Sequence, residues 1–381
     1  MKGIRSDKII TPEGLFDGVV LFENGKIIAV QKNVPEHVDT LDARGKFVSP
    51  GFIDIHTHGG GGHPFEGSVA DIVEGCRFHL SHGTTTVCPT VSAAPFSDMA
   101  RSVSNIKDAM KEMPTILGAH LEGPYLSAKQ AGAQAPDFLT PPNAEEYLPL
   151  LEKHGGAIAR WTYAPENDKN GAFARALVAQ GVLPSAGHTD ALYEDMLIAE
   201  ASGCRLVTHL YSCTSTVTRE MGFRRLGVIE SAYLSDDMFV EIICDGKHLP
   251  PELIRMIVKI KGCQRVILVT DSLALTGTNL TEGRMQATDF IIEDGVCKLR
   301  DRTAFAGSIA TADRLLHVAV KEANIPLLDA VRMLTETPAN LLGLSDRGKI
   351  AASARADIVL FDEDIRVSTV LVNGKLMYKS N

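Results

Sequence analysis

Apolar residues in the middle of the chain fall into short strand-like runs separated by stretches with helical spacing. Stretches such as ADIVEGCRFHLSHG (70–83) and ALYEDMLIAEASG (191–203) are typical of amphipathic helices. Strands that alternate with such helices indicate parallel βαβ units, and eight of them predict an α/β fold of the (β/α)8 TIM-like barrel type over residues 51–344. The eight runs are GFIDIHTH (51–58), TTTVCPT (84–90), TILGAHLEG (115–123), ARWTYAPE (159–166), LPSAGHT (183–189), RLVTHLY (205–211), FVEIICDGKH (239–248) and VILVTDS (266–272).

The same alternation of strands and helices is also compatible with an open doubly wound sheet. Such a sheet commonly carries a glycine-rich dinucleotide fingerprint between its first strand and the helix that follows. Here the four glycines at 59–62 follow a pair of histidines and lead into HPFEG, which is not a helix start. The barrel is therefore favoured, and we expect the glycines to let this loop bend away without crowding a metal or substrate at the barrel mouth.

The two ends of the chain have a different pattern, with short strands around tight turns. VVLFENGKIIAV (19–30) places Asn24-Gly25 between two apolar runs, and Asn373-Gly374 repeats the arrangement near the C-terminus. Asn-Gly between apolar runs is a strong hairpin signal. Neither end is large enough for its own core, so we expect residues 1–50 and 345–381 to form one small β-sandwich domain. A further hairpin is predicted at Asp294-Gly295.

Composition narrows the class of protein. Among 381 residues, 45% are hydrophobic and 22% are charged, as in ordinary globular enzymes, and the formal net charge is −9. This charge argues against a general nucleic-acid or membrane surface, although it permits a local cationic pocket. The seven cysteines include no C-x-x-C pair, and the start MKGIRSDKII has no apolar segment of signal-peptide length. We therefore expect a cytoplasmic protein with reduced thiols.

Polar side chains gather at the C-terminal ends of the predicted strands, where barrel enzymes carry their chemistry. A histidine at a strand end is more often a hydrogen-bonded structural residue than a metal ligand. The joint placement of several carboxylates and imidazoles at one end instead indicates a metal centre of the zinc type. Glu122, His188 and His209 form one candidate ligand set, and His56 and His58 form a second. The strand ends also carry His120 and Asp271.

Six motifs occur in the order and spacing of a known family. They are PGFIDIHTHGG, HLEGP (120–124), AGHT (186–189), VTHLY (207–211), VTDS (269–272) and AGS (306–308). The chain resembles the amidohydrolase superfamily over essentially its whole length, and within it the N-acetylglucosamine-6-phosphate deacetylase family. The resemblance implies metal binding by Glu122, His188 and His209, with Asp271 as the catalytic acid/base. Because His56 and His58 are both present, it allows one or two divalent ions per chain, with zinc expected first and iron second.

The resemblance also implies a substrate pocket. It puts Arg219 and His248 at phosphate-contacting positions, which in the family reach across a homodimer interface. Two departures from the family pattern stand out: Ser212-Cys213-Thr214 replaces the usual Asn-Ala-Met, and Gln134 replaces a substrate-contacting His. We expect Ser212, Cys213 and Gln134 to contact substrate. We also expect hydroxyls from Thr214 to Thr216 to assist in holding the phosphate.

The implied reaction is hydrolysis of the N-acetyl amide of an amino sugar 6-phosphate, of the glucosamine or galactosamine type, with release of acetate. A metal that activates water, together with an adjacent carboxylate that moves the proton, suits amide hydrolysis. Two alternatives stay open at this point. One is an amidohydrolase that acts on another N-acyl compound or a cyclic amide, and the other is a non-catalytic sugar-phosphate binder.

Overall fold

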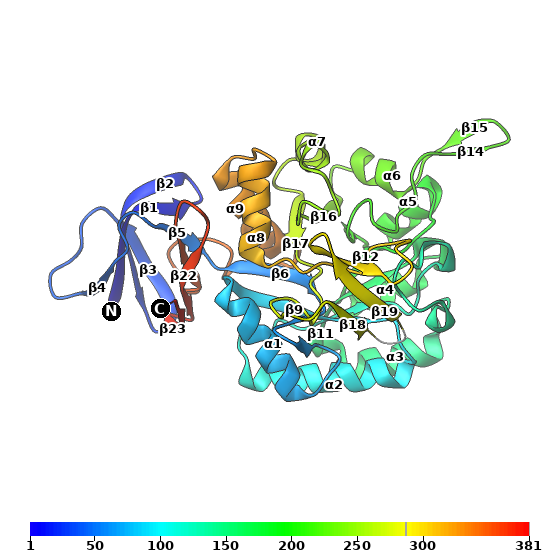
Figure 1. The fold of residues 1–381 in the computed structure, drawn as a ribbon, viewed down its shortest axis with the longest axis horizontal. Helices are drawn as coiled ribbons and strands as arrows, with labels where there is room; N and C mark the ends of the chain where they lie inside the picture. Colours follow the sequence, from blue (N-terminus) through cyan, green and yellow to red (C-terminus); the bar gives the residue numbers. More distant parts are fainter. Residues whose placement is uncertain (286–287, 381) are drawn as a thin grey trace.

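The computed structural model describes residues 1–285 and 288–380. Figure 1 shows an elongated molecule with a small β-sheet region at one end and a larger helix-covered barrel at the other. Both chain termini lie in the sheet region. The barrel is the part that brings the candidate ligands together.

Eight parallel strands form the barrel, in the order β17-β16-β13-β12-β11-β10-β9-β6. Hydrogen bonds connect the two ends of this order: His58 N donates to Ser272 O over 2.8 Å, and Asp271 N donates to His56 O over 2.9 Å. The sheet is therefore closed, which confirms the barrel and rules out the open doubly wound sheet. The strands are β6 (Phe52–Thr57), β9 (Thr84–Ser92), β10 (Ala119–Glu122), β11 (Ile158–Tyr163), β12 (Leu183–Ala186), β13 (Leu206–Val207), β16 (Phe239–Ile243) and β17 (Val266–Val269).

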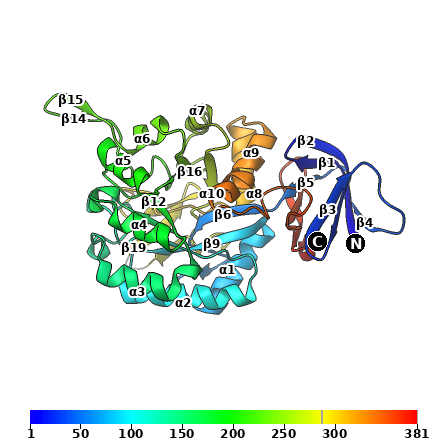
Figure 2. The ribbon, with the colours of Figure 1, turned by 180° about the vertical axis from the view of Figure 1, so that it is seen from behind.

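Helices surround the strands, as the sequence periodicity predicts (Figure 2). The first, α1, begins after Ser68, whose side chain accepts from Asp71 N while the Asp71 side chain accepts from Ser68 N. This reciprocal capping satisfies backbone donors that a helix start leaves free. The helices are α1 (Val69–Ser81), α2 (Phe96–Glu112), α3 (Ala144–His154), α4 (Ala172–Ala179), α5 (Tyr193–Ala201), α6 (Val228–Leu234), α7 (Pro251–Lys261), α8 (Ala312–His317), α9 (Leu327–Leu334) and α10 (Glu336–Leu341).

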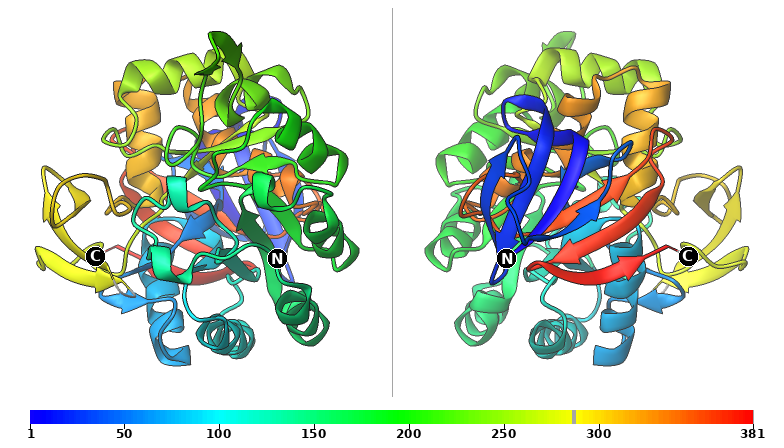
Figure 3. Two further views of the ribbon diagram at one scale, coloured as in Figure 1. Left: turned by 90° about the vertical axis from the view of Figure 1, so that its right-hand side faces the viewer. Right: turned by 90° about the vertical axis from the view of Figure 1, so that its left-hand side faces the viewer.

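Strands from both ends of the chain form one sheet, in the order β23-β22-β21-β5-β1-β2-β3, with β4 paired to β1. The two ends pair as expected, but the predicted sandwich is one continuous hydrogen-bonded sheet with its own apolar core. Figure 3 shows the strands from both termini together at this end of the molecule. The strands are β1 (Lys2–Thr11), β2 (Gly14–Glu23), β3 (Lys26–Gln31), β4 (Asp39–Asp42), β5 (Phe47–Pro50), β21 (Ile358–Phe361), β22 (Val367–Val372) and β23 (Lys375–Lys379).

Both Asn-Gly turns join antiparallel strands, as predicted. Asn24 and Gly25 have φ of 51° and 81°, and Asn373 and Gly374 have φ of 51° and 68°. Two consecutive positive φ values match the right-handed twist of the flanking strands. The division into residues 1–50 plus 345–381 and 51–344 stays a prediction.

Two small additions extend from the barrel. β18 (Glu282–Met285), β19 (Thr288–Glu293) and β20 (Val296–Leu299) form a sheet, and the predicted turn at Asp294-Gly295 joins its last two strands. A second hairpin, β14 (Thr218–Glu220) with β15 (Phe223–Arg225), projects away from the barrel in Figures 1 and 2. The sequence analysis did not predict it.

The glycine run after His58 packs tightly against the residues that follow it. Gly59-Gly60 (β7) pairs with His63-Pro64 (β8), and a Cβ on Gly59 would lie 2.3 Å from the His63 carbonyl oxygen. The glycines are therefore needed for close backbone approach, and the expectation that they keep this loop from crowding a metal or substrate stays a prediction. Among the described residues, the helices are all too short or too polar to cross a membrane.

Candidate active site

The candidate ligands lie together at the C-terminal ends of the barrel strands. Each sits at the end of its strand or in the residues that follow, and the ring closure brings the first strand beside the last. All six side chains are buried or nearly so. They are His56 (β6), His58 (directly after β6), Glu122 (β10), His188 (after β12), His209 (after β13) and Asp271 (after β17).

The first ligand set converges on one carboxylate oxygen. Glu122 Oε1 lies 3.2 Å from His188 Nε2 and 3.0 Å from His209 Nε2, and these two Nε2 atoms are 3.1 Å apart. His188 Nδ1 lies 2.9 Å from the Gln130 carbonyl oxygen, which can only accept, so Nδ1 carries the proton. In the neutral ring, His188 Nε2 therefore presents a lone pair beside the carboxylate. Such converging lone pairs fit a divalent cation.

The second ligand set uses the same carboxylate. His58 Nε2 lies 3.4 Å from Glu122 Oε2, and His56 Nε2 lies 3.4 Å from Glu122 Oε1. Both nitrogens of His56 are buried without a hydrogen-bond partner among the described residues. An orphaned imidazole nitrogen that faces a carboxylate fits a metal ligand. Glu122 thus stands between two sets, each with its ligand atoms within 4.8 Å of one another.

Asp271 lies beside the second set. Its Oδ1 is 3.3 Å from His58 Nε2 and 3.5 Å from His56 Nε2. Burial alone would raise the pKa of Asp271, but the charges of His56 and His58 outweigh burial and lower the pKa. Asp271 is therefore a carboxylate at neutral pH, as a proton acceptor must be.

The surrounding charges set the protonation of the ligands. Burial would raise the pKa of Glu122, but the neighbouring imidazoles of His56, His188 and His209 hold the pKa well below its usual range. Burial would lower the pKa of His56, but Glu122 and Asp271 raise it to about 9. The buried carboxylates thus favour positive charge at this position, which a divalent ion supplies.

His120, although it also ends a strand, has an ordinary structural role. Its Nδ1 lies 3.0 Å from Thr90 Oγ1, and its Nε2 lies 2.8 Å from Thr162 Oγ1. Burial lowers the pKa of His120 well below its usual range, so the ring is neutral. Both nitrogens are engaged with hydroxyls, which leaves neither for a metal.

Several residues that support the ligands were missed by the sequence analysis. Arg160 and Glu241 form a buried ion pair inside the barrel. Glu241 Oε2 accepts from His209 N over 3.2 Å and lies 3.5 Å from His56 Nδ1. A signal for this pair was available in the sequence, because Arg160 and Glu241 each stand as a charged residue inside an apolar strand run. Charged residues at such positions are rarely buried unless they are paired.

His58 has its own orienting partners. Its Nδ1 lies 3.1 Å from Ser92 Oγ, which is 3.0 Å from Glu66 Oε1. A carboxylate–hydroxyl–imidazole chain of this kind fixes the ring orientation of a metal ligand.

Several residues of the candidate active site have left-handed backbone conformations. His188, His209 and Asp271 have φ of 46°, 29° and 47°, and Tyr211 and Cys213 have φ of 77° and 49°. Residues other than glycine adopt this conformation at a cost, and they tend to cluster at functional sites.

A pocket of about 290 Å³ opens onto the ligands. It is lined by Gln134, Ser212, Cys213 and His248, all predicted substrate contacts, and by Phe305, whose ring centroid lies 5.0 Å from that of His248. His248 Nδ1 is held 2.8 Å from Asp245 Oδ2, which leaves Nε2 as the other polar atom of the ring.

Arg219 and the hydroxyls of Ser215 and Thr216, all expected to help hold the phosphate, do not line this pocket. Arg219 is on the exposed hairpin β14–β15 and does not line the pocket of its own chain. Ser215 Oγ donates to Ala191 O over 2.5 Å, and Thr216 Oγ1 donates to Glu230 Oε1 over 2.8 Å. The expectation that these two hydroxyls face the substrate was wrong, because they tie the loop to neighbouring elements.

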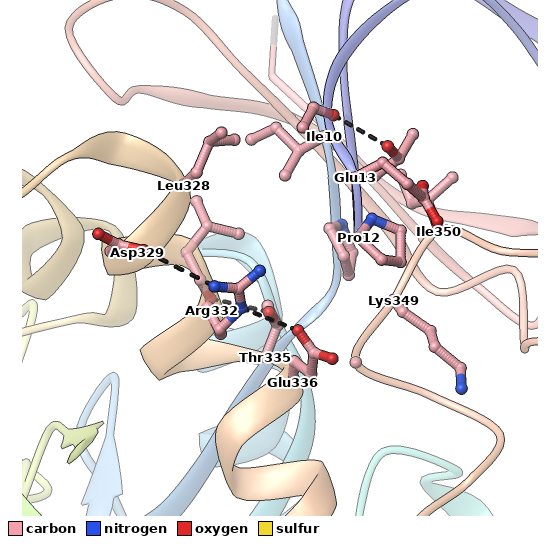
Figure 4. A pocket seen from close by; sticks show the side chains of 15 residues that line it. Ile10, Pro12, Glu13, Leu328, Asp329, Arg332, Thr335, Glu336, Lys349 and Ile350 are labelled. Atoms are coloured by element: carbon pink, nitrogen blue, oxygen red, sulfur yellow. Dashed lines mark hydrogen bonds and ion pairs between the residues drawn. The ribbon is translucent and has the colours of Figure 1, made fainter. Parts of the chain in front are cut away.

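A separate cavity of about 160 Å³ lies between the terminal sheet and the barrel, beside α9 (Figure 4). Its Arg332 is paired with Asp329 over 3.7 Å and with Glu336 over 2.9 Å. The charge of Arg332 is thus neutralised by carboxylates in the cavity wall. The candidate active site is therefore the pocket at the barrel mouth.

Comparison with known proteins agrees with this geometry. Residues 47–377 match the model of the amidohydrolase family. The chain belongs to the amidohydrolase family. It is a metal-dependent hydrolase with a (β/α)8 barrel, as the motifs predicted.

Relatives and solved structures give further detail. The chain is 32% identical over 336 residues to N-acetylgalactosamine-6-phosphate deacetylase of Shewanella sp. (strain ANA-3), with 87% of this chain and 83% of the relative covered. It is 31% identical over 366 residues to N-acetylglucosamine-6-phosphate deacetylase of Haemophilus influenzae, with 92% of this chain and 93% of the relative covered. A solved mutant of the Mycobacterium smegmatis N-acetyl-D-glucosamine-6-phosphate deacetylase, in complex with N-acetyl-D-glucosamine-6-phosphate, has a TM-score of 0.93 at 30% identity, with 99% of each chain covered.

Proposed function

We propose that the protein hydrolyses the N-acetyl amide of a hexosamine 6-phosphate, releasing acetate and the free amino sugar phosphate. The observation that carries the proposal is the convergence of Glu122, His188 and His209 at the mouth of a closed barrel, with Asp271 beside the adjoining His56 and His58. The relatives named for N-acetylglucosamine-6-phosphate and N-acetylgalactosamine-6-phosphate support the substrate class.

The chain's own residues divide the chemical work. A divalent ion bound by Glu122, His188 and His209 supplies Lewis-acid polarisation of the amide carbonyl and lowers the pKa of water. Asp271 accepts a proton from the attacking water and delivers it to the departing amine nitrogen, so the amine leaves neutral. The imidazoles of His56 and His58, both within 3.5 Å of Asp271 Oδ1, keep this carboxylate ionised until it takes the proton.

The metal is proposed to be zinc, with iron as the second choice, at one or two ions per chain: one in the first set, and a second, where present, at His56 and His58. Two imidazoles and a carboxylate with room for water form a typical catalytic zinc site. Affinity alone does not choose between these metals, so availability decides as well.

Recognition of the phosphate is proposed to need a second copy of the chain. Among the described residues that line the pocket, there is no lysine or arginine. The hairpin β14–β15 carries Arg219 away from its own barrel, together with Met221 at 90% and Phe223 at 74% exposure. Large apolar side chains with so much exposed surface on a projecting hairpin favour burial against a partner. A homodimer in which Arg219 of one copy reaches the pocket of the other, opposite His248, accounts for both features.

A cytoplasmic location is also proposed. All seven cysteines are free, and six of them are buried. Free thiols are typical of reducing compartments.

Acetate release from paired substrates tests the function. N-acetylglucosamine 6-phosphate and N-acetylgalactosamine 6-phosphate are assayed against the same sugars without phosphate, with the metal-loaded protein. Turnover of at least one phosphorylated sugar, with kcat/KM well above that of its unphosphorylated form, is expected. Equal turnover with and without phosphate would contradict the phosphate assignment, and no acetate from any of the four would contradict the function.

A further inference from the structure

Gln134 is a buried amide that joins a metal ligand to the barrel wall. It lies in the loop between β10 and α3, and only 6% of its surface is exposed. Its Oε1 accepts from Ala93 N over 2.9 Å, and its Nε2 donates to Glu122 Oε2 over 2.8 Å. Both ends of the carboxamide are therefore engaged.

The direction of the amide follows from these two contacts. Ala93 N can only donate, so it needs the amide oxygen, and the ionised carboxylate of Glu122 can only accept, so it needs the amide NH₂. The flipped amide would place two oxygens together at one end and two N–H groups together at the other. The side chain thus acts as a one-way donor to Glu122.

This donor selects how Glu122 presents its two oxygens. The terminal torsion of a glutamate is broad and nearly two-fold, so the side chain does not fix its own carboxylate plane. With Oε2 held by Gln134, Oε1 is directed to His188 and His209, 3.2 and 3.0 Å away. The first ligand set therefore depends on a contact outside its own members.

The loop that carries Gln134 is itself anchored. Gln134 N donates to Ala131 O over 2.9 Å, and Thr288 Oγ1, in β19, donates to Ala133 O over 3.0 Å. These hydrogen bonds to the backbone of Ala133 and Gln134 fix the position of the Gln134 side-chain amide above the barrel strands.

We infer that Gln134 is a positioning residue for the metal ligand Glu122, and that its main effect is on metal affinity rather than on sugar binding. The inference rests on the metal site of the proposed function and not on the identity of the substrate. Partners that orient a metal ligand typically contribute about 10- to 100-fold to metal affinity.

The test compares metal affinity in Gln134→Met and wild type. Methionine is close in length but donates no hydrogen bond. Zinc-loaded protein is titrated with a chromophoric chelator in the absence of substrate, and the dissociation constant is expected to rise about 10- to 100-fold. Gln134→Leu carries the same expectation if the methionine variant does not fold. Lys129→Met is the matched control, because Lys129 is in the same loop but is exposed and pairs with Asp190 at 2.9 Å. The zinc affinity of this variant should equal that of wild type.

A zinc dissociation constant within twofold of wild type would overturn the inference. Steady-state kinetics at saturating zinc separates the two roles of the side chain further. A variant with normal zinc affinity and a KM raised 10-fold or more would make Gln134 a substrate contact instead. Because the zinc titration contains no sugar, its outcome is independent of whether the protein is a deacetylase.

Discussion

Replacing Asp271 with asparagine tests the assignment of the proton carrier most directly. Asparagine has nearly the same shape but cannot accept a proton from water at neutral pH. General acid–base catalysis contributes about 10²- to 10⁴-fold to the rate. The Asp271 side chain is only 11% exposed, so bulk water or buffer has little access to replace it. We therefore expect the upper part of that range, a loss of about 10³- to 10⁴-fold in kcat, or about 4 to 5.5 kcal/mol of transition-state stabilisation.

The assay must separate this loss from loss of metal. Asp271 Oδ1 lies nearest to His58 and His56, while Glu122, His188 and His209 form the other set. The Asp271→Asn variant should accordingly retain at least one ion per chain by elemental analysis. Acetate release is then measured at saturating substrate and metal. Normal metal content with kcat above a tenth of wild type would refute the role of Asp271.

Three further predictions concern the phosphate, the second ion and the polar layer beneath the ligands. Arg219→Met should raise KM about 10-fold or more for the phosphorylated sugar, as expected for a lost charge-assisted hydrogen bond, and should leave the unphosphorylated sugar unaffected; equal effects on both sugars would remove Arg219 from the site. His56→Ala should lower metal content by no more than one ion per chain, and complete loss of metal on elemental analysis would show that the two sets are not separable. Glu241→Gln leaves the buried Arg160 without its carboxylate and should lower the free energy of unfolding in denaturant by about 3 to 5 kcal/mol; a change below about 1 kcal/mol would show that the pair is not needed.

The barrel and its candidate ligands could be predicted from the sequence for a physical reason. Parallel strands that are buried on both faces are mostly apolar, so each appears as a short apolar run, and each run ends where the barrel mouth begins. Polar residues at those ends, such as His56, His188 and Asp271, therefore stand out by position alone. Ring closure then brings residues far apart in sequence together without any local signal.

The hairpin β14–β15 could not be predicted in the same way. Its strands are exposed on both faces, so the sequence lacks the period-two alternation that identifies a half-buried strand. The role of Gln134 was hidden for another reason, since its partners Glu122 and Ala93 are 12 and 41 positions away. Contacts between loops and strand ends leave no periodic trace, and only the folded structure reveals them.

The projecting hairpin and the pocket that lacks a lysine or arginine are best understood as one feature. The described lining offers His248 and Ser212 to an anion, but it also holds two carboxylates, the metal ligand Glu122 and the neighbouring Asp271. The described part of this lining offers no lysine or arginine to bind the phosphate of a substrate, so a cationic side chain from outside the chain would supply that contact. Arg219 stands on an arm whose apolar side chains favour contact with another molecule. Assembly of two copies would thus supply the charge that one copy lacks, and subunit association would become part of substrate recognition.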